Sequence, residues 1–80
     1  MRIDKYLKVT RLIKRREIAK QLCDSSYVQI NGKIAKAMSE VNAGDHISIK
    51  LGDRLIKALV LEIREFANKE QASSMYQIEK

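Results

Sequence analysis

The stretch "RLIKRREIAKQL", residues 11–22, predicts a helix with an unusual beginning. Its apolar residues are spaced to pack on one side of the chain; they are Leu12, Ile13, Ile18 and Leu22. Three cations, Lys14, Arg15 and Arg16, stand together where the helix should begin. A cation at a helix N-terminus faces exposed N–H dipoles and costs about 0.3–1 kcal/mol of helix stability. Such a cost is tolerable if the partner of this segment is an anion.

Two short amphipathic helices are expected around this stretch. In "RIDKYLKV", residues 2–9, Ile3, Tyr6 and Leu7 form an apolar stripe, so Tyr6 is expected in the core. The second helix should run from about Arg15 to Ser25. Its buried stripe should comprise Ile18, Ala19, Leu22 and Cys23, with Arg16 and Lys20 on the opposite side.

The pattern changes to strands after residue 26. In "YVQINGKIAKA", residues 27–37, Val28 and Ile30 share a face, and Asn31-Gly32 predicts a tight turn in which Asn31 accepts a positive φ. A polar contact from Asn31 to RNA is the alternative interpretation. Two further strands should follow, one with inward residues Ile47, Ile49 and Leu51 and a long one through Leu59, Leu61 and Ile63.

The end of the chain predicts two smaller elements. "NKEQASS", residues 68–74, is polar and fits a loop or a short helical turn, and "MYQIEK", residues 75–80, fits a final edge strand. The fold class is therefore α+β, with two N-terminal helices packed on a small, mostly antiparallel sheet. Eighty residues are expected to form one domain.

The net charge of +6 is concentrated at the N-terminus. Residues 1–20 hold eight Lys and Arg against two acids, whereas residues 21–80 hold eight of each. Segregated basic charge is typical of a docking face for a polyanion, although a solvated basic face is the alternative. Phosphate contacts are expected from the cations of this segment, which include Arg2, Lys5, Lys8, Lys14, Arg15, Arg16 and Lys20. Asp4 either stabilises its helix start through the dipole or orients an arginine such as Arg16.

Several function classes find no support in the sequence. No apolar run approaches the roughly 20 residues that span a bilayer, and no signal peptide is evident, so a cytoplasmic protein is expected. One cysteine, Cys23, and one histidine, His46, cannot complete a four-ligand zinc site. Neither a paired-carboxylate site nor a phosphate-binding glycine loop is evident. We expect a protein that is not an enzyme and needs no cofactor.

Four segments together resemble a known RNA-binding family. "RIDKYL", "RREIAKQL", "YVQINGKIAKA" and "NAGDHI" occur in the order found in the domain named after ribosomal small-subunit protein S-four, also called the alpha-L motif. The resemblance covers about residues 1–51, and the further strands lie in residues 52–80. The small size and the "KVTRLIKRREIAK" stretch most resemble the stand-alone bacterial members that act in ribosome-associated quality control.

This resemblance implies a function and a set of partners. Such members bind large ribosomal subunits, through ribosomal RNA, when these are obstructed by peptidyl-tRNA. They act with an RqcH-type tailing factor that adds a C-terminal alanine tail to the stalled chain. The resemblance implies RNA contacts by Arg2, Asp4, Lys5 and Arg16, with Lys14, Arg15 and Lys20 as flanking phosphate contacts. A monomer is expected.

The chain departs from the family pattern at two positions. Arg15-Arg16 replaces the usual Ser-Arg, which removes a serine cap from the second helix. Ser26 replaces a glycine before the first strand, so a positive φ there would strain the serine.

Three alternatives remain at this stage. One is a ribosome-recycling factor of the heat-shock-protein-fifteen type, whose members are usually longer. Another is a general tRNA- or rRNA-binding module that acts in trans with an RNA-modifying enzyme. The third, a polybasic membrane-surface protein, is disfavoured because no strongly apolar face is left over once the core is built.

Overall fold

A computed structural model describes residues 1–79 and confirms the α+β class. Three helices accompany a five-stranded sheet of order β2-β1-β3-β4-β5, in which every strand pairing is antiparallel. The elements in chain order are α1 (Ile3–Val9), α2 (Arg16–Asp24), β1 (Val28–Ile30), β2 (Lys33–Ile34), β3 (His46–Leu51), β4 (Arg54–Val60), α3 (Lys69–Ser74) and β5 (Tyr76–Ile78).

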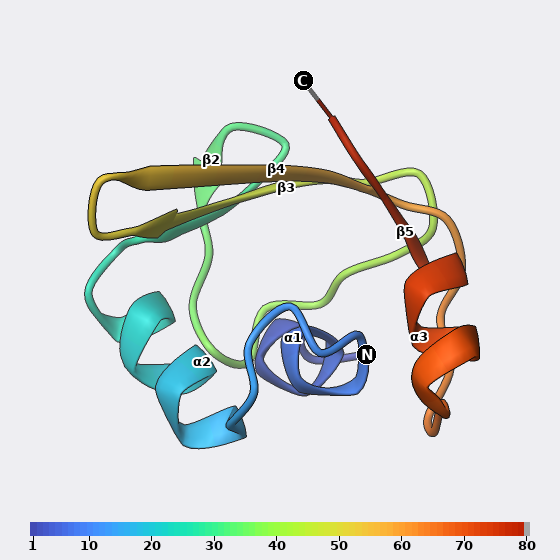
Figure 1. The fold of residues 1–80 in the computed structure, drawn as a ribbon. Helices are drawn as coiled ribbons and strands as arrows, with labels where there is room; N and C mark the ends of the chain where they lie inside the picture. The colour runs from blue at the N-terminus through green and yellow to red at the C-terminus, as the bar shows by residue number, and fades with distance from the viewer. Residues whose placement is uncertain (80) are drawn as a thin grey trace.

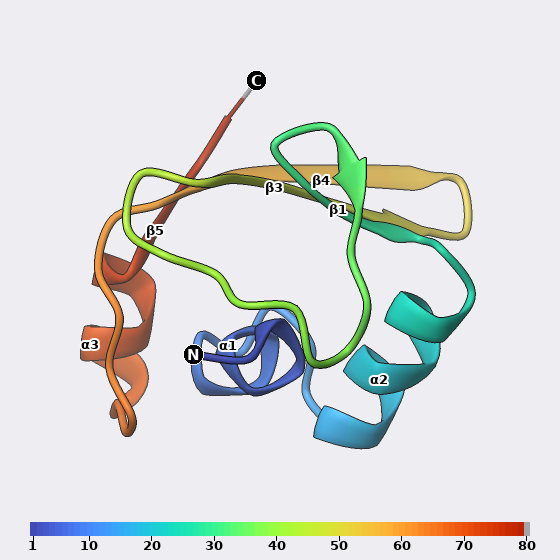
Figure 2. The same cartoon turned by 180° about the vertical axis from the view of Figure 1, so that it is seen from behind.

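The helices lie on one side of the sheet, with α1 between α2 and α3 (Figures 1 and 2). The predicted stripe of α1 is confirmed, since Ile3, Tyr6 and Leu7 are fully buried against the inward residues of β1 and β3. The Tyr6 hydroxyl donates a hydrogen bond of 2.9 Å to the Met75 carbonyl oxygen. Burial also raises the pKa of the Tyr6 phenol. One short helix therefore links the N-terminus to the C-terminal part of the core.

Helix α2 ends in a backbone motif that explains Ser26. The N–H of Tyr27 donates to the Leu22 carbonyl and the N–H of Ser26 donates to the Cys23 carbonyl, a pair of bonds that requires a left-handed residue after the helix. Ser26 supplies it with φ of 64°. The positive φ that would strain a serine at this position is confirmed.

The turn between β1 and β2 is also confirmed, with φ of 52° at Asn31 and 82° at Gly32. The Asn31 side chain contributes further, because its Oδ1 accepts from the backbone N–H of His46 at 2.9 Å.

At the C-terminus, residues 68–74 adopt the helical turn, one of the two forms predicted for them. Asn68 and Gln71 cap it reciprocally, and β5 returns as an edge strand. The last residue of "MYQIEK" lies outside the described residues.

Two predictions about apolar residues are wrong. Ile18 is 40% exposed, so the buried face of α2 is narrower than predicted and centres on Ala19 and Cys23. The long strand ends at Val60 rather than continuing through Leu61 and Ile63, which are exposed. Beyond Val60 the regular pairing with β5 stops, because the successive N–H groups of Leu61 and Glu62 both donate to one acceptor, the carbonyl of Met75 just before β5.

No helix within residues 1–79 has the length and apolar character needed to cross a membrane.

Replacing Ser26 by glycine should stabilise the protein. A left-handed conformation costs a non-glycine residue about 1–2 kcal/mol, and the extra chain entropy of glycine offsets about half of this. We expect Ser26→Gly to raise the free energy of unfolding by about 0.5–1 kcal/mol in urea titrations. The matched control is Ser25→Gly, because Ser25 has φ of –89° and gains nothing from glycine. Equal effects of the two substitutions would contradict the strain argument.

Candidate nucleic-acid interface

One buried carboxylate organises the basic N-terminal segment. Asp4, in the first turn of α1, is only 2% exposed. Its Oδ2 lies 3.1 Å from a guanidinium nitrogen of Arg2, and its Oδ1 lies 3.4 Å from one of Arg16. The same Oδ1 accepts from the backbone N–H of Lys5 at 2.8 Å. Of the two interpretations of Asp4, orientation of arginines is therefore confirmed.

The two arginines reach Asp4 from different directions. Arg16 is the first residue of α2, which packs beside α1. Arg2 precedes α1, and its backbone forms an isolated antiparallel β-bridge with Glu40. In the same segment, residues 37–41, the Ser39 carbonyl accepts a hydrogen bond of 2.8 Å from the N–H of Ile3. Packing of three separate segments thus brings the cluster together.

Both guanidinium groups remain accessible to solvent. The Arg2 and Arg16 side chains are 49% and 47% exposed, so each retains N–H donors that do not face Asp4. A guanidinium presents several donors in one plane, which suits phosphate oxygens and the faces of unpaired bases. We name this group the Arg2–Asp4–Arg16 cluster.

A hollow of about 280 Å³ adjoins this cluster and contains a cation that sequence reasoning missed. Arg2 and the predicted Lys20 line it, together with Asp24, Lys36 and Met38. Lys36 follows β2 and lies at the α2 side of the molecule only because the chain folds back there. The sequence alone did not single out Lys36 as part of a basic surface, because the basic residues in 21–80 are balanced by equal numbers of acidic residues.

The remaining predicted cations are distributed around this region. Lys14 and Arg15 precede α2, where Arg15 is the N-cap residue and makes no side-chain capping bond within residues 1–79. Its guanidinium lies 3.9 Å from Glu17. The missing serine cap is thus confirmed. Among the described residues, Lys8, Lys14 and Lys20 form no ion pair, and all three are exposed.

Lys5 points away from the Arg2–Asp4–Arg16 cluster. Its ammonium group pairs with Glu65, and this contact holds the pKa of the Glu65 carboxyl below its ordinary value. The same ammonium nitrogen lies 5.6 Å from the centroid of the Phe66 ring. Lys5 therefore belongs to the side of α1 that faces the segment between β4 and α3.

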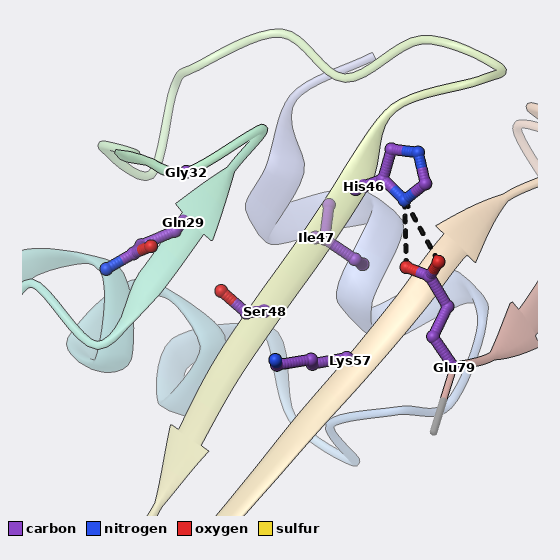
Figure 3. Close-up of a pocket in the computed structure, with 7 residues that line it drawn as sticks. All are labelled: Gln29, Gly32, His46, Ile47, Ser48, Lys57 and Glu79. Carbon is purple, nitrogen blue, oxygen red and sulfur yellow. Dashed lines mark hydrogen bonds and ion pairs between the residues drawn. The ribbon is translucent and has the colours of Figure 1, made fainter.

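A separate hollow lies on the open face of the sheet, opposite the helices. Figure 3 shows it between Gln29, Ser48 and Lys57. At one end of the hollow, His46 Nδ1 lies within hydrogen-bond distance of the Glu79 carboxyl, at 2.9 Å. Its residues come from β1, the turn between β1 and β2, β3, β4 and the end of the chain, and none belongs to the basic N-terminal segment. No group of three or more metal-ligating side chains is found within residues 1–79.

Cys23 lies in the core beneath the cluster. It is buried, and burial together with the carboxylates of Asp4 and Asp24 raises the pKa of its thiol to about 11. The predicted role as a small buried apolar residue is confirmed.

Comparison with known proteins gives the family. The S4 domain matches residues 1–47, more than half of the chain. The chain belongs to the S4 domain family. The matched region of this S4 domain contains α1, α2, β1 and β2, and hence the whole Arg2–Asp4–Arg16 cluster.

Relatives across nearly the whole length carry one name. A protein of Halalkalibacterium halodurans is 42% identical over 80 residues, 100% of this chain and 91% of its own. A Bacillus subtilis protein is 46% identical over 78 residues, 98% of this chain and 91% of its own. Both are named "RQC P-site tRNA stabilizing factor". The resemblance to the stand-alone members, the RqcP (YabO) group, is thereby confirmed.

The fold of this S4 domain also matches a solved structure. Heat Shock Protein 15 of Vibrio cholerae, described as trimeric, superposes with a TM-score of 0.90 at 25% identity. The match covers 99% of this chain and 81% of that one.

Removing the charge of Asp4 should weaken the fold. Asp4→Asn deprives two guanidinium groups of a charge-assisted partner, so we expect a decrease of about 1–3 kcal/mol in the free energy of unfolding. The matched control is Asp24→Asn on the exposed end of α2, which should change stability by less than about 0.5 kcal/mol. Urea denaturation measures both. Indistinguishable midpoints for the two variants would contradict the organising role of Asp4.

The thiol of Cys23 should be unreactive in the folded protein. With its pKa raised from 9.0 to about 11, the thiolate fraction at pH 8 falls roughly 100-fold, and burial further limits access. Ellman's reagent should therefore label the native chain at least 100-fold more slowly than the chain in guanidinium chloride. The Cys23 thiol ionises at a lower pH in the unfolded chain than in the folded protein. The free energy of unfolding should therefore decrease as pH rises from 9.0 to about 11, and Cys23→Ala should remove this decrease. Equally fast labelling of both states would disprove the burial argument.

Proposed function

We propose that this chain is a non-catalytic RNA-binding factor of ribosome-associated quality control. In this role it binds large ribosomal subunits that are obstructed by peptidyl-tRNA and stabilises the tRNA in the P site. The full chain, residues 1–80, acts as a single RNA-binding domain in the bacterial cytoplasm. It contributes binding contacts and no bond chemistry.

The observation that carries this proposal is the Arg2–Asp4–Arg16 cluster. Two half-exposed guanidinium groups are fixed by one buried carboxylate, inside a segment that holds the whole net charge of the protein. A fixed guanidinium loses little side-chain entropy when it binds phosphate. The shared name of the relatives, which match 98–100% of this chain, supports tRNA on the ribosome as the source of that phosphate.

The cations around the cluster would extend the contact. Lys8, Lys14, Arg15 and Lys20 are exposed and can each approach a phosphate without breaking a strong internal ion pair. Each phosphate neutralised releases condensed counterions, so affinity should fall steeply with salt. Asp4 would act indirectly, by orienting the arginines.

The proposal includes one protein partner. An RqcH-type factor would extend the stalled chain with alanine, and the present protein would support each cycle by keeping the P-site tRNA in position. This part follows from the resemblance to the quality-control members of the family.

Removing Arg16 should weaken subunit binding strongly while leaving the fold intact. Without the charge-assisted hydrogen bonds that this guanidinium gives to RNA, binding to purified large subunits carrying peptidyl-tRNA should weaken by about 10-fold or more. The slope of log affinity against log salt should fall by about 1 for each phosphate that the variant no longer neutralises. Sucrose-gradient sedimentation and salt titrations measure these effects on Arg16→Ala, with circular dichroism as the check on folding.

The matched control removes a cation from the other face of the sheet. Lys57→Ala lowers the net charge by the same amount but lies on the open sheet face (Figure 3), so it should bind like the wild type. A wild-type chain that stays at the top of the gradient would reject the proposed function. An Arg16→Ala variant that binds as tightly as Lys57→Ala would reject the assigned site.

A second candidate follows from the structural similarity to Heat Shock Protein 15. In this alternative the chain binds large subunits as a recycling factor without supporting alanine tails. Deletion of the gene distinguishes the two candidate functions. Only the quality-control role predicts that stalled chains lose their alanine tails when the gene is deleted. Light scattering of the purified protein tests the expected monomer against the trimer described for that neighbour.

A further inference from the structure

Phe66 is an exposed aromatic residue in a charged setting. It is the sole phenylalanine of the chain and is 85% exposed, more than any other large apolar residue within residues 1–79. It lies in the segment between β4 and α3, beyond the residues that match the S4 domain. Nothing in the core requires an aromatic ring at this position.

The ring is nevertheless held in place by its neighbours. The Lys5 ammonium lies over it at 5.6 Å from the centroid and also pairs with Glu65. The Lys5–Glu65 pair joins this segment to α1 and places a cation beside the ring. With most of the residue exposed, the ring remains open to a partner.

Further cations surround the ring. A hollow beside Phe66 is lined by Lys8, Val9, Arg11, Glu65 and Ala67. Lys8 and Arg11 are exposed and form no ion pair with any residue from 1 to 79. Arg11 adopts φ of 62°, a conformation that costs a non-glycine residue stability and that turns the chain directly after α1.

This region is continuous with the Arg2–Asp4–Arg16 cluster. Lys8 follows Asp4 by four residues and Lys5 by three, so along α1 it neighbours both the buried Asp4 and Lys5. Figures 1 and 2 show α1 between α2 and the segment that leads to α3. A nucleic-acid strand on the cluster could therefore cross α1 and reach Phe66.

We propose that Phe66 is a stacking platform for one unpaired RNA base, with Lys8 and Arg11 binding the flanking phosphates and Lys5 holding the ring. An exposed ring beside cations is the arrangement that recognises single-stranded nucleic acid. A protein partner is disfavoured because three of the five residues that line the hollow beside the ring, Lys8, Arg11 and Glu65, are charged, whereas an apolar docking site needs a continuous apolar surface. The inference rests on the RNA-binding function proposed above.

The experiment uses the full chain and purified large ribosomal subunits carrying peptidyl-tRNA. Equilibrium co-sedimentation compares wild type, Phe66→Leu, Phe66→Trp and Leu55→Ala. Phe66→Leu keeps an apolar side chain but removes the ring, and Phe66→Trp keeps a stacking surface. Leu55→Ala is the control, since Leu55 is 60% exposed on β4, away from the helices. Circular dichroism confirms folding of each variant.

Loss of one base stack should weaken binding of Phe66→Leu by about 5-fold or more. Phe66→Trp should bind at least as tightly as wild type, and Leu55→Ala should bind with wild-type affinity. If Phe66→Leu binds like wild type, or if Phe66→Trp is weakened as much as Phe66→Leu, the stacking role is overturned and an apolar or purely structural role replaces it. If wild type itself fails to bind the subunits, the proposed function fails and this inference fails with it.

Discussion

The burial of α1 is the constraint on which the rest of the structure depends. This seven-residue helix fills the space beneath the sheet with Ile3, Tyr6 and Leu7, and its N-terminal N–H groups are paired with carbonyls of the segment 37–41. Its tyrosine reaches the C-terminal part of the chain at Met75. Because so much of α1 is covered, the side chains it still presents to solvent are mainly cations, and the fold and the candidate interface share one element.

The electrostatics of the N-terminal segment explain the odd beginning of α2. Arg15 and Arg16 stand where cations weaken a helix, and Glu17 in the first turn relieves this only in part. The compensation for Arg16 comes from outside the helix, through the buried Asp4 on α1. The arrangement leaves a surface with excess positive charge and few internal partners. This is a state that an RNA phosphate backbone would stabilise, and a small core can tolerate it because each local cost is small.

Much of the fold was predictable because its signals are local. Periodicity identified both N-terminal helices, Asn31-Gly32 identified a turn, and the family pattern pointed to strain at Ser26. The errors occurred where a local pattern was overruled by a distant contact. Leu61 and Ile63 alternate like a strand, but the N–H groups of Leu61 and Glu62 both donate to the carbonyl of Met75, and the strand ends at Val60. Ile18 has helical spacing, yet the neighbouring elements cover only the side of α2 that carries Ala19 and Cys23.

The amino-acid order alone specified the segregated charge, the apolar stripes and the turn residues, since each depends on neighbours within a few positions. Tertiary packing selected the partners of the charged groups. It placed Asp4 between two arginines, turned Lys5 toward Glu65, and brought Lys36 beside Arg2. The position of Phe66 next to α1 has the same origin. Ion pairs and shared hollows depend on which surfaces meet in space, and periodicity along a chain carries no information about contacts between residues as far apart as Lys5 and Glu65.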